Sequence, residues 1–255
     1  MTGLASGGRL AIAGLGPGDP RLVTPEVAAA LETATDLVGY GPYVARVAAG
    51  PGLAVHASDN REELDRARHA LDLAAAGRQV VIVSSGDPGV FAMAAAVFEA
   101  LESGPPAWQA LEIAVLPGVT AMLAAAARLG APLGHDFCAI NLSDNLKPAA
   151  LIERRLRLAA QADFAMALYN PRSRARPEGF ARALAILGEE CGADRLICFA
   201  RAVATDEERL SVVTLAAAVP EMADMRTVVI VGSSATRRVG RHVYTPRGSV
   251  PAGSG

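Results

Sequence analysis

Short aliphatic runs alternate with alanine-rich segments along the first half of the chain, and this alternation limits the possible folds more than any other feature. Each aliphatic run has the length of one strand, and the alanine-rich segments have the apolar spacing of helices. Strands that alternate with helices build a largely parallel sheet covered by helices. The sequence therefore predicts an α/β fold, and a hydrophobic content of 51% is enough for a large core.

Five strands are expected in the first domain, at residues 9–13, 36–38, 53–56, 79–84 and 112–116. Thr24-Pro25-Glu26 is typical of a helix start, with Thr24 as N-cap and Pro25 at the first helical position, and this helix should run to about Ala34. Further helices are expected from Ser58 or Asp59 to before Gly77, near 91–101, and over 119–129 with Gly130 as the closing cap.

After Gly134 the alternation becomes less regular. Strands are expected at 137–142, 164–169, 195–200, 210–213 and 227–231, and helices over 148–160 and roughly 178–190. The longer connections indicate a second, mixed sheet. We expect an N-terminal α/β domain over 1–133, a C-terminal α/β domain over 134–240, and a flexible tail over 241–255.

Three glycine-containing turns each follow a predicted strand: GLGPGDP at 14–20, SSGDPG at 84–89 and LPGVTA at 116–121. The first turn is neither a dinucleotide fingerprint, because prolines interrupt it, nor a phosphate-binding loop, because it lacks Lys-Ser/Thr. Since ligands of open parallel sheets bind at the carboxyl ends of the strands, the three turns should face one small-molecule site. Each turn taken alone also fits an ordinary strand-to-helix connection.

Two polar residues in these turns have more than one possible role. Asp87 fits both a cap of the following helix and an acceptor of hydrogen bonds from a ligand. Thr120 is expected in the first turn of a helix, where its hydroxyl and the free backbone N–H groups can meet a carboxylate.

The charge is distributed unevenly along the chain. Residues 1–150 carry a net charge of −6 and residues 151–255 a net charge of +4, which together give the −2 of the whole chain. A basic second half favours an anionic partner, although a solvated arginine-rich surface explains it equally well. The aromatic content of 4% disfavours nucleic acid as that partner.

Cysteine usage and the lack of sorting signals point to a cytoplasmic protein. Cys138, Cys191 and Cys198 have no CxxC spacing and no nearby histidine, so we expect neither disulfides nor a metal site. We find no signal-peptide pattern and no apolar run of about 20 residues, so no membrane association is expected.

Five segments resemble the tetrapyrrole (corrin/porphyrin) methylase family: GLGPGDPRLVT, SSGDPGVFAMA, PGVTAMLAAAARLGAPLGHDF, LSDNLKP and YNPRS. The resemblance covers about residues 9–232 and is strongest for the branch that methylates a corrin precursor at C(17). It implies the two-domain tetrapyrrole methylase fold, with a parallel-sheet N-terminal domain, a mixed-sheet C-terminal domain and an active site in the cleft between them. It also implies a homodimer and S-adenosylmethionine as methyl donor.

The resemblance assigns site residues through these motifs. The cofactor would contact Pro17, Ser85, Gly86, Asp87, Val90, Thr120, Ala121, Asn170 and Ala202. The substrate would contact Gly18, Asp19 and Tyr40. Tyr40 stands where the uroporphyrinogen-methylating branch has an acidic residue thought to act as a base, so a carboxylate base is not expected there.

The implied reaction is methylation of precorrin-3B at C(17), coupled to contraction of the ring. The electron-rich macrocycle is itself the nucleophile, so the protein mainly aligns the reactants. Arg172 and Arg174 are expected to bind the acetate and propionate arms, whereas Arg154 and Arg155 are expected on a solvated helix face. Asp144 and Lys147 are the expected proton donors for the contraction, although Ser143 or Asp144 also fits a simple turn cap.

Three other functions stay open at this point. The first is a corrin-ring methylase that acts at another carbon or on a cobalt-containing substrate. The second is an RNA 2′-O-methylating relative, which the low aromatic content disfavours. The third is a corrinoid-binding carrier without catalysis, against which the intact turns at 85–90 and 118–121 argue.

Overall fold

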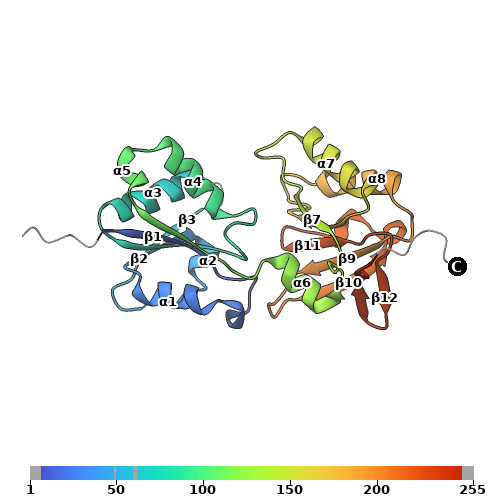
Figure 1. The fold of residues 1–255 in the computed structure, drawn as a ribbon, viewed down its shortest axis with the longest axis horizontal. Coiled ribbons are helices and arrows are strands. Elements are labelled where there is room, and N and C mark those ends of the chain that lie inside the picture. Colours follow the sequence, from blue (N-terminus) through green and yellow to red (C-terminus); the bar gives the residue numbers. More distant parts are fainter. Residues whose placement is uncertain (1–6, 49, 60–61, 249–255) are drawn as a thin grey trace, which may run out of the picture. The chain divides into compact units, whose positions relative to one another are not determined.

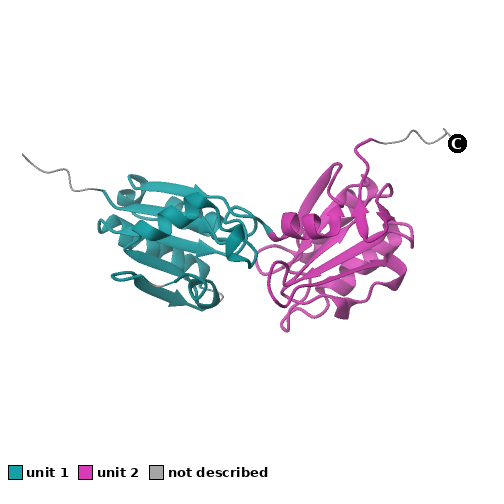
Figure 2. Cartoon of the chain, turned by 90° about the horizontal axis from the view of Figure 1, so that it is seen from below, with its two compact units in different colours: residues 1–120 teal, residues 121–255 magenta. Residues whose placement is uncertain are grey.

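The computed structural model describes residues 7–48, 50–59 and 62–248, and these residues form two compact units (Figures 1 and 2). Unit 1 is Met1–Thr120 and unit 2 is Ala121–Gly255. The predicted domain boundary lay between residues 133 and 134. The contacts instead divide the chain before helix α6 (Ala121–Leu129), because α6 contacts strand β11 (Thr227–Val231) of the second sheet.

Unit 1 contains a five-stranded parallel sheet in the order β3-β2-β4-β1-β5. The strands are β1 (Arg9–Gly14), β2 (Asp36–Tyr40), β3 (Ala54–Ser58), β4 (Gln79–Ser84) and β5 (Glu112–Leu116). The helices are η1 (Pro20–Leu22), α1 (Pro25–Thr33), α2 (Gly41–Val44), α3 (Glu63–Ala75), α4 (Met93–Ser103) and α5 (Pro106–Gln109). The prediction of a parallel first sheet is confirmed.

Both faces of this sheet are buried, as the near-continuous aliphatic strands require. Leu10 and Ile12 of β1 pack with α3 and α4 on one face. Ala11 and Ala13 point to the other face and pack with α1. In Figure 1, α3, α4 and α5 lie on one side of the sheet and α1 on the other. With both faces covered, the carboxyl edge of the sheet and its connecting turns offer backbone to a ligand.

Unit 2 contains a five-stranded mixed sheet in the order β10-β9-β11-β8-β7. The strands are β7 (Phe137–Asn141), β8 (Ala165–Tyr169), β9 (Leu196–Arg201), β10 (Arg209–Thr214) and β11, and β7 and β8 are its parallel pair. Helices α7 (Ala149–Gln161) and α8 (Gly179–Glu190) cover one face of the sheet, around the buried Phe180 and Leu156. Two short helices, η2 (Leu215–Ala217) and η3 (Pro220–Met222), follow β10. The predicted mixed second sheet is confirmed.

A small third sheet changes the prediction for residues 242–244. We expected them in a flexible tail, but they form β13 (His242–Tyr244), which pairs with β12 (Arg237–Val239) and β6 (Gly130–Ala131). Val243 is fully buried, and the Thr245 hydroxyl donates to the Pro132 carbonyl at 2.6 Å. A Cβ on Gly130 would lie 2.6 Å from the Val243 carbonyl oxygen, so Gly130 permits this strand contact. Residues 249–255 of the expected tail lie outside the described residues.

Two helix starts were also predicted too early. Helix α3 begins at Glu63 rather than at Ser58 or Asp59, because β3 continues through Ser58. Helix α6 begins at Ala121 rather than at Val119, so Thr120 directly precedes it. Among the described residues, no helix is both long and apolar enough to cross a membrane.

Candidate functional site

The three glycine turns meet at the carboxyl edge of the first sheet, as the sequence predicted. They follow β1, β4 and β5, which are neighbours in the sheet. The first two turns are joined directly: the Gly16 N–H donates to the Gly86 carbonyl at 3.2 Å, and the Gly86 N–H donates to the Gly16 carbonyl at 2.9 Å. Gly16 and Gly86 both have a positive φ, which glycine adopts without steric cost.

Asp87 joins the second turn to the third. One of its carboxylate oxygens accepts the Gly89 N–H at 2.8 Å, and the other accepts the Gly118 N–H at 3.0 Å. Helix α4 begins six residues after Asp87 with Ala92 at its N-cap position, so Asp87 does not cap that helix. The structure therefore gives Asp87 a bracing role between turns, and its contact with a cofactor stays a prediction.

Glycine is needed in these turns because the backbones pack against one another. A Cβ on Gly118 would lie 2.2 Å from the Gly86 carbonyl oxygen and 2.8 Å from that of Gly14. A Cβ on Gly14 would lie 2.6 Å from the Gly86 oxygen. These distances are far below van der Waals contact, and the atoms met are backbone atoms that no rotamer change can move.

Arg46 is part of this edge and was missed by the sequence reasoning. It follows the short helix α2, and its Nη2 lies 2.6 Å from the Leu15 carbonyl and 3.1 Å from the Gly16 carbonyl. Its Nη1 lies 3.4 Å from the Ser85 hydroxyl. Arg46 is exposed as a residue, yet desolvation of its guanidinium end lowers the pKa of Arg46, which Tyr43 only partly offsets. No motif marks this arginine, because its partners are carbonyls brought near by the fold.

The other predicted residues of unit 1 lie at or beside the same turns. Pro17, Gly18 and Val90 are half-buried, and Thr120 is buried directly before α6. Tyr40 ends β2, and its ring meets that of Tyr43 edge to face at 5.2 Å.

Asp19 is already engaged within its own turn. Its carboxylate accepts hydrogen bonds from the Arg21 backbone N–H at 2.9 Å and from the Arg21 guanidinium at 2.7 Å. The Asp19 side chain thus caps η1. A substrate contact by Asp19 stays a prediction, and it would have to compete with this pairing.

In unit 2, two predicted cofactor residues lie at one edge of the mixed sheet. Strands β8 and β9 both pair antiparallel with β11, so they run in the same direction and their carboxyl ends share an edge. Asn170 follows β8 with φ +51°, and Ala202 follows β9 with φ +47°. The Asn170 amide donates to the Asn141 side-chain oxygen at 3.1 Å, at the end of the neighbouring β7. Left-handed backbone costs about 1–3 kcal/mol at most non-glycine residues and less at Asn, and strained residues of this kind cluster at functional sites.

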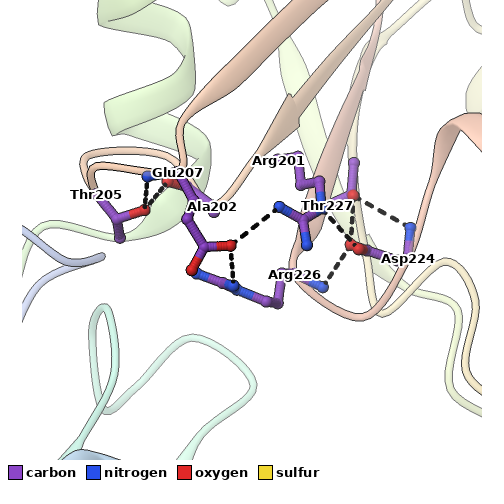
Figure 3. A network of polar contacts seen from close by, with 7 residues as sticks. All are labelled: Arg201, Ala202, Thr205, Glu207, Asp224, Arg226 and Thr227. Carbon is purple, nitrogen blue, oxygen red and sulfur yellow. Dashed lines mark hydrogen bonds and ion pairs between the residues drawn. The ribbon is translucent and has the colours of Figure 1, made fainter.

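A polar network holds Ala202 in this conformation (Figure 3). The Ala202 N–H donates to the Arg226 carbonyl at 2.8 Å, and the Ala202 carbonyl accepts the Thr205 hydroxyl at 2.8 Å. In the loop before β11, Asp224 accepts from Arg201 at 2.8 Å and from Thr227 at 2.8 Å. Burial alone would raise the pKa of Asp224, but these hydrogen bonds outweigh it and lower that pKa.

The two candidate proton donors lie in the loop between β7 and α7, where the sequence placed them. Asp144 Oδ1 lies 3.8 Å from Arg176 Nε, and its Oδ2 lies 3.9 Å from Arg182 Nη2. Lys147 is half-buried, and burial, followed by the charge of Arg155, lowers the pKa of Lys147. Ser143 donates its backbone N–H to the Asn141 side-chain oxygen at 2.9 Å, and α7 has Pro148 at its N-cap position.

The predicted substrate arginines differ in their contacts. Arg172 is half-buried and lies 3.6 Å from Glu221. Arg174 is exposed. Arg154 and Arg155 are exposed on α7, as predicted for a solvated helix face.

Among residues 7–48, 50–59 and 62–248, no group of three or more His, Cys, Asp or Glu side chains is arranged to hold a metal ion. Cys138, Cys191 and Cys198 are free thiols.

Comparison with known proteins agrees with this fold. Residues 9–219 match the family model described as Tetrapyrrole (Corrin/Porphyrin) Methylases. The chain belongs to this family.

Several relatives are similar over nearly the whole chain. The precorrin-3B C(17)-methyltransferase of Sinorhizobium sp is 54% identical over 245 residues, which cover 94% of this chain and 96% of that protein. The cobalamin biosynthesis protein CobIJ of Mycobacterium tuberculosis is 45% identical over 96% of this chain and 49% of its own length. The crystal structure of the methyltransferase CobJ superimposes with a TM-score of 0.92 at 68% identity, covering 94% of this chain and all of that one.

Proposed function

We propose that this chain transfers a methyl group from S-adenosylmethionine to C(17) of precorrin-3B, with contraction of the ring, in cobalamin biosynthesis. The observation that carries the proposal is the meeting of three backbone turns at one sheet edge in a member of this family. The 54% identity to a protein named for this reaction supports the particular substrate.

The residues at the carboxyl edge of the first sheet fit a small-molecule methyl donor that is held by backbone groups. The turns are mostly backbone with few long side chains, and Pro17, Ser85 and Val90, which lie in or directly after them, are half-buried. When bound, S-adenosylmethionine supplies an electrophilic methyl group whose departure leaves the bond electrons on sulfur. Gly86 and Asp87 would shape its binding surface at the edge of the first sheet, and contacts from Asn170 and Ala202 stay predictions of the family resemblance.

The work of the protein in this reaction is alignment rather than activation. The ring carbon is the nucleophile, so no side chain has to be deprotonated to attack. Fixing two reactants in an in-line geometry can lower the barrier by about 7–11 kcal/mol. The mutual bracing of the turns by Gly16, Gly86 and Asp87 suits this role, because a rigid surface holds its ligand in one orientation.

Of the two candidate proton donors for ring contraction, we favour Lys147. Its pKa is lowered by burial, so its proton is released more readily at neutral pH. Asp144 lies at ion-pair distance from two guanidinium groups, which suits a carboxylate that orients Arg176 and Arg182. We further propose that Arg172 and Arg174 bind carboxylate arms of the substrate, and that the enzyme acts as a cytoplasmic homodimer.

The experiment is incubation of the purified protein with methyl-labelled S-adenosylmethionine and precorrin-3B, followed by mass spectrometry and NMR of the product. Label at C(17) of a contracted ring supports the proposal. Label at another carbon, or no label in the tetrapyrrole, refutes it. Lys147→Met should slow contraction more than methyl transfer, with Lys147→Arg as the charge-retaining control.

Two alternatives can be separated in the same assay. A protein named probable cobalt-factor III C(17)-methyltransferase from Salmonella typhimurium is 38% identical over 94% of this chain, so a cobalt-containing substrate is the second candidate. Parallel incubation with cobalt-factor III tests it. A non-catalytic carrier need not bind S-adenosylmethionine, so calorimetric titration with that cofactor tests the carrier alternative.

A further inference from the structure

We propose that Arg46 is the receptor for a carboxylate group of a bound ligand at the carboxyl edge of the first sheet. This inference rests on the proposed function, which brings two sources of carboxylate to this edge. One source is an acetate or propionate arm of the tetrapyrrole, and the other is the methionine carboxylate of the cofactor.

The position of Arg46 puts its charge between two ligand-facing turns. Its Nη2 contacts the Leu15, Gly16 and Gly18 carbonyls at 2.6, 3.1 and 3.5 Å. Its Nη1 reaches Ser85 across the gap to the second turn at 3.4 Å. A guanidinium carries five N–H donors in a planar fork, and these contacts occupy mainly the Nη2 end. Nε makes none of these contacts, so its N–H can still donate to a carboxylate oxygen, with the charge of the whole guanidinium beside it.

Arg46 also differs from the other described arginines of unit 1 in its partners. Four of them pair with carboxylates: Arg9 with Glu112, Arg21 with Asp19, Arg68 with Asp65 and Arg78 with Asp36. Arg66 is buried and donates to Ser58, Met93 and the Asp59 carbonyl. Among the described residues of this unit, no carboxylate contacts the Arg46 guanidinium, so a bound anion would be its first full counter-charge.

The surroundings of Arg46 make a fixed cation rather than a mobile one. A long arginine side chain usually loses much conformational freedom when its guanidinium binds a ligand. Here the carbonyls of the first turn already hold the guanidinium, so less freedom is left to lose.

The test compares Arg46→Lys and Arg46→Gln, with Arg68→Gln as the matched control. Lysine keeps the charge, whereas glutamine keeps N–H donors for the Leu15 carbonyl without the charge. Arg68 is exposed on α3 and has one surface ion pair, so its loss should change little. The full-length variants are titrated with uroporphyrin III, with S-adenosylmethionine and with decarboxylated S-adenosylmethionine, and their thermal unfolding is recorded.

If Arg46 binds a tetrapyrrole arm, Arg46→Gln weakens uroporphyrin binding about 10- to 100-fold, and Arg46→Lys loses clearly less. If it binds the methionine carboxylate, Arg46→Gln instead removes the preference of the wild type for S-adenosylmethionine over its decarboxylated form. Either pattern supports the inference and identifies the source.

Equal losses for lysine and glutamine would mean that Arg46 only shapes the turn, and this result overturns the inference. The inference is also overturned if Arg46→Gln and the control Arg68→Gln bind all three probes with the same affinity. Methyl transfer to precorrin-3B by the wild type is measured alongside. If the wild type transfers the methyl group and Arg46→Gln binds all three probes like the wild type, the carboxylate receptor is refuted and the proposed function stands. If the wild type transfers no methyl group, the proposed function itself is refuted.

Discussion

Replacing Gly118 by alanine should disable the cofactor site, because this glycine lies where the three turns touch. The new Cβ would lie 2.2 Å from the Gly86 carbonyl oxygen and 2.8 Å from the Gly14 oxygen. Both neighbours are backbone atoms of a sheet-anchored turn. Relief therefore requires the third turn to move outward by about 1 Å, as overpacked sites do.

The energy of this shift can be worked from the contacts it breaks. Overpacking costs about 1–3 kcal/mol. Moving Gly118 also weakens the hydrogen bond from its N–H to the Asp87 carboxylate, a bond to a charged group worth about 1.5–3 kcal/mol. Because the two terms overlap, we expect unit 1 to lose about 2–4 kcal/mol of unfolding free energy. A misplacement of about 1 Å in a binding surface can reduce function by about 100-fold.

The assay is calorimetric titration of Gly118→Ala with S-adenosylmethionine, together with urea unfolding. Gly188→Ala is the control, since Gly188 lies in α8 with open space around its Cβ position and should gain about 0.5–1 kcal/mol. Cofactor affinity within threefold of wild type, at unchanged stability, would refute the claim that the packed turns form the site. Loss of stability with normal affinity would show that the turns support the sheet only.

Three further predictions concern stability and reactivity. Burial would raise the pKa of Asp36, but hydrogen bonds from Thr35, His56 and Arg78 outweigh burial and lower that pKa. The ionised Asp36 therefore stabilises the fold fully above the ordinary carboxyl pKa, and this stabilisation is lost as pH falls through the lowered pKa. Asp36→Asn should therefore cost about 2 kcal/mol in urea unfolding at pH 7 and progressively less on acidification below pH ~4; a pH-independent loss would contradict this. Ala202→Gly should leave stability unchanged or raise it by up to about 1 kcal/mol, since φ +47° is unstrained for glycine, and a loss above 1 kcal/mol in thermal unfolding would contradict the strain. Burial raises the pKa of Cys198 to about 12, so a thiol reagent at pH 8 should label it only after urea is added, and prompt labelling in the native protein would contradict its burial.

Much of the fold could be predicted from the sequence because its aliphatic runs indicate where buried strands lie. The strands at 79–84, 112–116 and 227–231 have the predicted bounds. The short strands β12 and β13 were missed because their stability comes from pairing with β6, far away in the chain, and not from a local pattern. The early start predicted for α3 has a similar cause, since pairing with β2 keeps Ser58 in a strand.

The site divides in the same way between local and long-range signals. Glycine turns that follow strands can be recognised in the sequence alone, and the parallel sheet brings them together as expected. The partners of Asp87 were not readable, because Gly118 lies 31 residues away and offers only a backbone N–H. Arg46 was missed for the same reason: its contacts with Leu15 and Ser85 arise from the order of strands β2, β4 and β1.

The backbone shape at the carboxyl edge of each sheet is fixed by different physical means in the two units. This difference determines which positions tolerate substitution. In unit 1 the shape comes from glycines whose Cβ positions are filled by other backbone, so almost any replacement at Gly14 or Gly118 is excluded. In unit 2 the shape at Ala202 comes from a strained backbone held by side chains of neighbouring segments, among them Thr205. A strained residue persists only when its surroundings determine it, so the network can accept different side chains provided that the same hydrogen bonds form. We therefore expect the first edge to tolerate far fewer substitutions than the second.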